Sequence, residues 1–131
     1  MSDPNNDAKS TRLQLSLHEH GVIFMWPPNS TAVLHADLDL DGGALIAGEF
    51  RGNLISRKGS VVITRTGRFI GNLEADRIYV EGMIGDLEFP DGNIVGRYSL
   101  AASSTASIMA NMRARAYAIH SARMFGKMEP F

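Results

Sequence analysis

Phe69-Ile70-Gly71-Asn72-Leu73 is one copy of a five-residue phrase that returns six times along the chain. The phrase reads apolar, any residue, Gly or Ala, usually Asn or Asp, then Leu or Met. Copies begin at Leu34, Phe50, Phe69, Met83, Ile108 and Met124, so they start 16, 19, 14, 25 and 16 residues apart. Positions one, three and five are apolar or small, which is the period of two of a strand with one buried face. Because so short a strand cannot bury its face alone, the repeats must stack, and the sequence predicts a single all-β solenoid.

A second set of short strands is expected between the phrases, each with its two outer residues pointing inward. These strands are Val61-Val62-Ile63, Ile78-Tyr79-Val80, Tyr98-Ser99-Leu100 and Tyr117-Ala118-Ile119. The longest gap between phrases contains Pro90-Asp91-Gly92-Asn93, a strong turn signal. The sequence therefore predicts a small protruding loop at residues 89–96.

The stretch 103–124 fits two structures. It is rich in Ala, Met and Arg, and Ile108, Met112, Ala116 and Ile119 fall at helical spacing. The same stretch holds the fifth phrase and a strand that mirrors residues 78–80. We expect strands here, because the repeat context overrides the helical propensity.

Residues 1–30 are expected to form an N-terminal tail with a short apolar segment at 21–28. Val22, Ile23, Phe24, Met25 and Trp26 are the most apolar run in the chain, and Pro27-Pro28 ends it. One interpretation is that this run covers the first turn of the solenoid. The other is contact with a membrane surface, where a lone Trp in an apolar run sits well. With Gly21 the run has six residues, which could dip into such a surface but could not cross it.

Composition excludes several classes of function. A chain of 131 residues is one domain, and its net charge of −1 gives no reason to expect a nucleic-acid partner. The absence of cysteine rules out disulfides and thiolate chemistry and suits the cytoplasm. No apolar run approaches the roughly 20 residues of a membrane helix, and the polar first residues do not resemble a secretory signal.

No residues form a convincing catalytic, cofactor or metal site. His18-Glu19-His20 offers two ligands on one strand face, too few for zinc, and the distant His35 and His120 are expected to be solvated. Asp37, Asp39 and Asp41 lack the bidentate Glu of a calcium loop and fit an acidic edge strand better. No serine lies in a nucleophile elbow, and no P-loop or dinucleotide fingerprint is present.

The outward positions of the phrase form two columns. Position four would stack Asn and Asp side chains, which can hydrogen-bond along the column. Its members are Asp37, Asn53, Asn72, Asp86, Asn111 and Lys127. Position two would give an apolar lateral stripe of Ile70, Ile84, Met109 and Phe125. A contiguous apolar row favours a contact surface, or burial under the N-terminal segment.

Residues 31–128 resemble the bactofilin family of bacterial polymer-forming cytoskeletal proteins. The closest stretches are residues 38–42, GRFIGNLEAD at 67–76 and IYVEGMIGD at 78–86. The chain departs from the family in Ala110, which replaces the usual Gly of the fifth phrase, and in the insertion at 89–96. The resemblance implies a right-handed parallel β-helix of about six three-sided turns, with no catalytic activity and no cofactor.

The resemblance also implies self-assembly, end to end, into nucleotide-independent filaments at the inner face of the cytoplasmic membrane. Implied partners are other copies of the chain, the membrane, and cell-wall or polarity proteins. The C-terminal turn offers Met124, Phe125 and Met128 instead of a polar cap, and residues 129–131 end the chain. By the family's spacing Met124 would carry the terminal contact, and Phe125 is its rival.

Two other functions remain as alternatives. A non-polymerising scaffold would present the lateral stripe to a partner. A hexapeptide-repeat acyltransferase or a β-helical carbonic anhydrase would need repeats in multiples of six, which spacings of 16, 19, 14 and 25 do not give.

Overall fold

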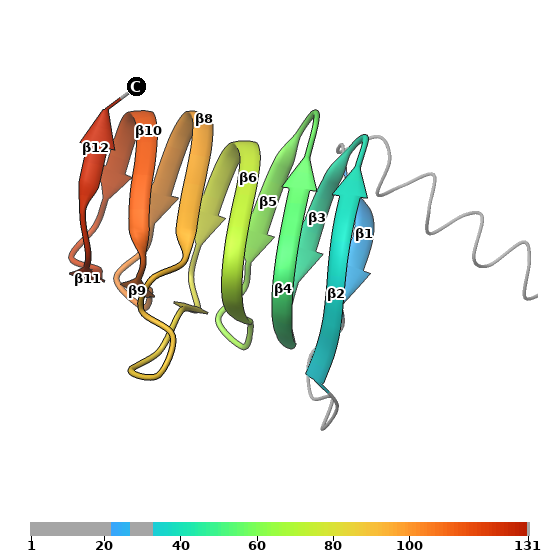
Figure 1. Cartoon of the computed structure of the whole chain (residues 1–131). Helices are drawn as coiled ribbons and strands as arrows, with labels where there is room; N and C mark the ends of the chain where they lie inside the picture. The colour runs from blue at the N-terminus through green and yellow to red at the C-terminus, as the bar shows by residue number, and fades with distance from the viewer. Residues whose placement is uncertain (1–21, 27–32, 131) are drawn as a thin grey trace, which may run out of the picture.

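The structure, a computed structural model, describes residues 22–26 and 33–130, and every regular element in these ranges is a β-strand (Figure 1). The strands are β1 (Val22–Trp26), β2 (Val33–Leu40), β3 (Gly43–Ile46), β4 (Glu49–Ser56), β5 (Ser60–Ile63), β6 (Arg68–Val80), β7 (Met83–Ile84), β8 (Asn93–Ala102), β9 (Ser107–Met109), β10 (Asn111–Ile119), β11 (Arg123–Phe125) and β12 (Met128–Pro130). The stretch 103–124 therefore forms strands and not the rival helix, as the repeat context predicts.

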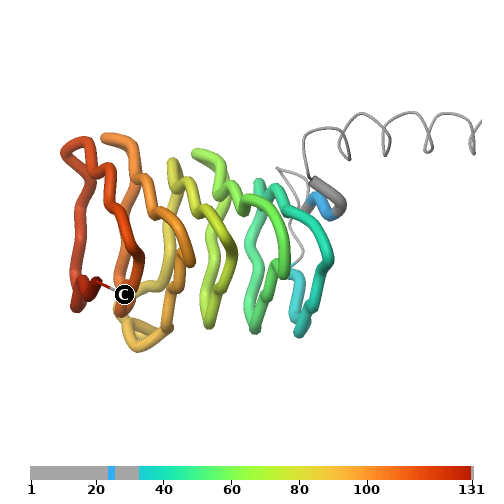
Figure 2. The backbone as a smooth tube through the Cα atoms, turned by 90° about the horizontal axis from the view of Figure 1, so that it is seen from above, coloured from blue at the N-terminus to red at the C-terminus, as the bar shows by residue number. Residues whose placement is uncertain are grey.

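The strands coil into a β-solenoid of about six turns in which every pairing is parallel (Figure 2). Equivalent positions of the phrase stack directly, so that Phe50 pairs with Phe69, Asn53 with Asn72, and Leu54 with Leu73. The predicted fold class is confirmed, while the hand of the coil stays a prediction.

Each turn contributes to three columns of stacked strand segments. Column A contains residues 33–35, 49–51, 68–70, 83–84, 107–109 and 123–125. Column B contains 37–40, 53–56, 72–75, 93–96, 111–114 and 128–130. Column C contains 22–26, 43–46, 60–63, 77–80, 99–102 and 116–119. The phrase thus spans columns A and B, and the second set of strands forms column C.

In the second and third phrases, glycine at position three is required by the backbone. Gly52 and Gly71 have φ of 139° and 136°, a region that side chains rarely adopt. A Cβ on Gly71 would lie 1.8 Å from the carbonyl oxygen of Gly52 in the turn before. The small residue therefore lets successive turns approach closely between columns A and B.

The core fills the inside of the coil with the inward residues of all three columns. The Phe50 and Phe69 rings stack with centroids 5.1 Å apart and planes 7° apart. Leu73 is 1% exposed, as the sequence predicts for position five. The largest fully buried side chains are Phe50, Phe69, Ile46, Leu54, Ile63, Leu73, Ile78, Ile84, Ile94, Leu100, Ile108 and Met112.

The fourth turn departs from the sequence prediction by one residue. Ile84, not Met83, pairs with Phe69 and is fully buried. The loop then interrupts the phrase after Gly85, and the phrase resumes at Asn93 and Ile94, which pairs with Leu73. Met83 and Ile84 are both apolar, so the sequence pattern alone did not distinguish the two registers.

The interrupting loop occupies residues 85–92 rather than 89–96. Leu87, expected inward at position five, is 87% exposed because it lies in this loop. The same turn carries one extra residue in β8, opposite Ala75–Arg77 of β6. Tyr98, also expected inward, is consequently 51% exposed, and Leu100 and Ala102 point inward in column C.

The strand β1 lies within the stretch predicted as a tail and pairs in parallel with β3. Phe24 packs against the edge of the core and Met25 is 39% exposed. Column C therefore starts one layer before columns A and B, and columns A and B end one layer after it, at β11 and β12. This pairing agrees with the interpretation in which the apolar run covers the first turn.

Candidate functional site

The C-terminal turn ends the solenoid with apolar side chains. Met124 pairs with Ile108 and packs against the core, whereas Phe125 pairs with Met109, points outward and is 57% exposed. Met128 follows the buried Met112 in column B and is 45% exposed. Met124 and Met128 thus belong to the end layer of the core, and Phe125 belongs to the side of the rod.

Polar contacts hold this last turn in place. The Tyr117 hydroxyl donates to the Glu129 carbonyl at 2.5 Å, and burial raises the pKa of this hydroxyl. Arg113 lies 3.6 Å from the Glu129 carboxylate. Among the described strands, β12 pairs only with β10, so its outer edge can accept a further strand.

The first turn is also open. The inward residues of β2, from Leu34 to Leu40, are only partly buried although they pack against the core. On the outside, Arg57 donates to both oxygens of Asp39 at 2.7 and 2.6 Å, and this hydrogen bonding lowers the pKa of the Asp39 carboxyl. The acidic edge strand predicted for Asp37, Asp39 and Asp41 is thus bound to the second turn through Asp39.

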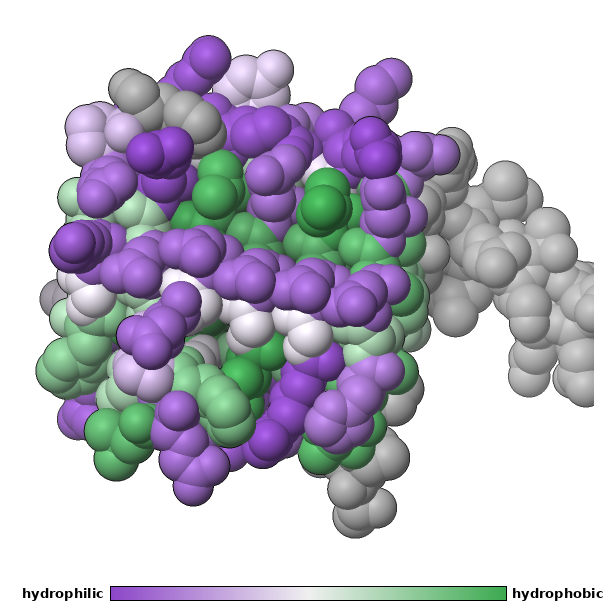
Figure 3. Space-filling model, viewed as in Figure 1, coloured by the Kyte–Doolittle hydropathy of each residue, from purple (hydrophilic) through white to green (hydrophobic). Residues whose placement is uncertain are grey.

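The predicted lateral stripe is not continuous. Ile84 lies in the core, so its predicted outward position is wrong, and Ile70 is only 5% exposed. Met109 and Phe125 remain, and with Leu87 and Pro90 of the loop they line a groove of about 460 Å³. Figure 3 shows apolar side chains gathered in this part of the molecule, over β9, β11 and the loop.

The polar column of position four exists, with one change of member. Asn53 donates to Asp37 at 2.9 Å, Asn72 donates to Asn53 at 2.8 Å, and the Asn93 backbone donates to Asn72 at 2.9 Å. Asn93 takes the place predicted for Asp86, which lies in the loop. Figure 3 shows the resulting hydrophilic band along the face formed by β2 to β10.

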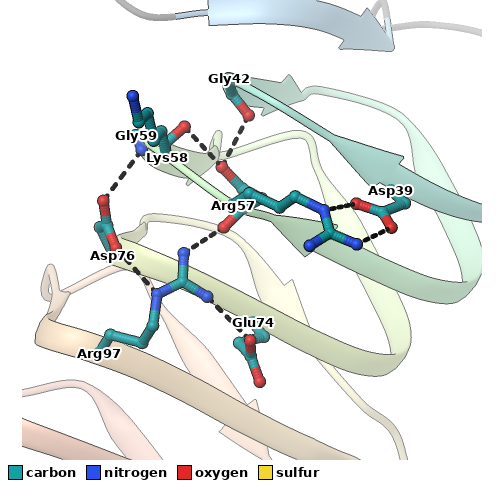
Figure 4. A network of polar contacts seen from close by, with 9 residues as sticks. Asp39, Gly42, Arg57, Lys58, Gly59, Glu74, Asp76 and Arg97 are labelled. Atoms are coloured by element: carbon teal, nitrogen blue, oxygen red, sulfur yellow. Dashed lines mark hydrogen bonds and ion pairs between the residues drawn. The ribbon is translucent and has the colours of Figure 1, made fainter.

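A cluster around Arg97 joins three turns at the corner between columns B and C (Figure 4). Arg97 donates to Asp76 and Glu74 at 2.8 Å each and also to the carbonyl of the buried Ser56. The hydrogen bond from Arg97 lowers the pKa of the Asp76 carboxyl, which also accepts the Gly59 N–H at 3.2 Å. Sequence reasoning missed this cluster, because its partners lie 21 to 41 residues apart.

A second arrangement missed by sequence reasoning lies beside it. Two guanidinium groups lie near the exposed ring of Tyr98. That of Arg77 is 5.9 Å from the ring centroid, and that of Arg115 is 5.8 Å from it. Consecutive turns bring these residues together, so only the register of the coil could have indicated them. We call these three residues the Arg–Tyr–Arg patch.

The other candidates fall in different places. Val22–Trp26 form β1, and His18, Glu19 and His20 lie outside the described residues. His35 and His120 are exposed, and within 22–26 and 33–130 no three His, Asp or Glu side chains are placed to hold a metal ion. The same ranges contain no helix that is long and apolar enough to span a bilayer.

Comparison with known proteins gives one family. Residues 29–129 match the family described as bactofilin, polymer-forming cytoskeletal. The comparisons with curated proteins and with solved structures found no match. The matched region runs from the start of β2 into β12, which is most of the chain, and the chain therefore belongs to the bactofilin family of polymer-forming cytoskeletal proteins.

Proposed function

We propose that the chain is the subunit of a filament that assembles end to end, without nucleotide, and acts as a scaffold for cell shape or protein localisation. The observation that carries this proposal is the C-terminal turn, where Met124 and Met128 form an exposed layer of core beneath an unpaired strand edge. Repeat solenoids that stay monomeric need a polar cap at such an end. The family assignment supports the same function.

The subunit is a short rod, because turns ~4.8 Å apart give six turns a length of roughly 25–30 Å. Both ends expose backbone groups of the outermost strands, β1 and β2 at one end and β11 and β12 at the other. Each end would meet its own copy through a two-fold axis. Two different two-fold contacts per subunit do not close, so the filament extends indefinitely and has no polarity.

The filament is proposed to lie in the cytoplasm, peripheral to the inner face of the membrane. The apolar run Val22–Trp26 is the candidate contact, since β1 lies at the open N-terminal end and exposes Met25. Cell-wall or polarity proteins are the further partners we propose. No catalytic step or cofactor enters this function, and a net charge of −1 gives no basis for nucleic-acid binding.

A second candidate function is a scaffold that does not polymerise and presents its side to a partner. The groove between the loop and the last turn favours it, because Leu87 and Phe125 are exposed there. A hexapeptide-repeat enzyme has no such support, and the family match argues against it.

Negative-stain microscopy and sedimentation of the purified chain, with no nucleotide added, separate these functions. Filaments of uniform width are expected from the first. A monomer or discrete small oligomer at every concentration tested would contradict the filament and favour the scaffold.

A further inference from the structure

The loop of residues 85–92 presents an acidic and apolar surface in a defined shape. Asp86 Oδ1 accepts the backbone N–H groups of Glu88 and Phe89 at 2.9 and 2.8 Å, which closes the turn. The Arg51 guanidinium lies 5.7 Å from the centroid of the Phe89 ring and anchors the loop to the coil. Leu87 at the loop surface is 87% exposed.

Two loop carboxylates are available to a partner. The Asp86 carboxylate is used within the turn, whereas the carboxylates of Glu88 and Asp91 are exposed and form no hydrogen bond or ion pair with a described residue. An exposed leucine between carboxylates fits a surface that combines cations with an aromatic ring.

The Arg–Tyr–Arg patch has those properties. Arg77 and Arg115 flank Tyr98, and neither forms an ion pair with any residue of the described ranges. Tyr79, two residues after Arg77 on the same outward face of β6, is 40% exposed and adds apolar area. Loop and patch are therefore complementary in both charge and polarity.

Their positions on the rod are also complementary. The loop belongs to the fourth turn, and the patch is centred on the same turn, with Arg77 in the third, Tyr98 in the fourth and Arg115 in the fifth. Figure 1 shows the loop at one edge of the coil and the bends of β6, β8 and β10, where the patch lies, at the opposite edge. Two rods side by side at the same level would bring the loop of one to the patch of the other.

We propose that this loop docks on the Arg–Tyr–Arg patch of a second copy of the chain in a neighbouring rod. Glu88 and Asp91 would pair with Arg77 and Arg115, and Leu87 would pack against the tyrosine ring. Because the two surfaces differ and lie at opposite edges, the contact repeats from rod to rod without closing. It would join filaments laterally into sheets or bundles.

A charge swap tests this contact. Glu88→Arg alone, or Arg115→Glu alone, should reduce the protein pelleted at low speed at least tenfold, since like charges then face each other across the contact. The double variant restores opposite charges and the wild-type net charge, and should pellet as wild type does. Glu81→Arg and Arg65→Glu make the same charge changes in mid-rod segments outside both surfaces, after β6 and after β5, and should leave bundling intact.

Mixing sharpens the test, because the contact is between unlike surfaces. Preformed filaments of Glu88→Arg and of Arg115→Glu should each stay single, and should bundle when combined. Microscopy gives filament width directly. Single variants that bundle as wild type does, or a double variant and a mixture that both stay single, would overturn the docking while leaving the end-to-end filament intact.

A disulfide crosslink can detect the contact between loop and patch even if no filament forms. The chain has no cysteine, so Glu88→Cys with Arg115→Cys introduces the only two thiols. Oxidation should give disulfide-linked oligomers, and Glu88→Cys with Arg65→Cys should not. Equal crosslinking of both pairs, or none of either, would contradict the proposal independently of the outcome for filaments.

Discussion

Leu73 and Gly71 illustrate what single residues contribute to this coil. Their places follow from the sequence, because the period of two sets the inward face and the small residue marks the close approach of turns. Ile84 could not be placed in the same way, since only its stacking on Phe69 distinguishes it from Met83. Arg97 could not either, because its partners become neighbours only when the coil has formed.

Leu73→Ala should lower the free energy of unfolding by about 2–5 kcal/mol, through lost burial and the cavity left behind. Leu87→Ala is the matched control, because the same change at a side chain that is 87% exposed should have almost no effect. Thermal unfolding is measured in a background that does not polymerise. Equal losses for the two variants would mean that the register of the core is wrong.

Asp76→Asn should lower the free energy of unfolding by about 1–2 kcal/mol at pH 7. This loss lies between the typical contribution of an exposed ion pair and that of a hydrogen bond to a charged group. The pKa of Asp76 is lowered in the folded state by Arg97, so its contribution is complete above the unfolded pKa of about 3.9 and is lost as the pH falls through the lowered value. The difference between wild type and variant should therefore shrink as the pH falls below the unfolded pKa. A difference that is constant with pH in chemical denaturation would exclude this electrostatic origin.

Among the elements, β1 and β8 differ most from what the pattern predicts. The apolar segment at 21–28 indicated either a cover of the first turn or a membrane contact. Its strand, β1, pairs in parallel with β3 because column C starts one layer before columns A and B. The extra residue in β8 is invisible in the sequence, because a bulge changes the register of inward residues without a distinctive residue type. The bulge places Tyr98 outside although the pattern predicts it inside, and the fourth turn, with Ile84 and the loop after it, is the other departure in register.

The two faces of β1 should separate its structural and membrane roles. Phe24→Ala should lower the melting temperature, because Phe24 packs against the core, whereas Met25→Asp should leave it unchanged. If the exposed face contacts lipid, Met25→Asp should reduce pelleting with vesicles of anionic lipids severalfold. Vesicle binding that is unaffected by Met25→Asp would leave β1 as a cover of the first turn only.

For the whole molecule, the sequence predicts the number of turns but not how the rod ends. The repeats count six, and the structure adds that column C is offset from columns A and B at both ends. It also separates two residues that the spacing left as rivals, placing Met124 in the end layer and Phe125 on the side. An end contact should therefore depend on Met124 and Met128, and Phe125 should affect lateral association.

Electron microscopy of Met128→Arg, with sedimentation and circular dichroism on the same sample, tests the end-to-end filament most directly. Across a two-fold contact each arginine would meet its own copy, desolvated and unpaired, which costs several kcal/mol. The expected result is a folded protein that stops at dimers joined through the N-terminal ends, while Phe125→Arg still forms single filaments. Normal filaments of Met128→Arg, with unchanged length and yield, would contradict assembly through the C-terminal turn.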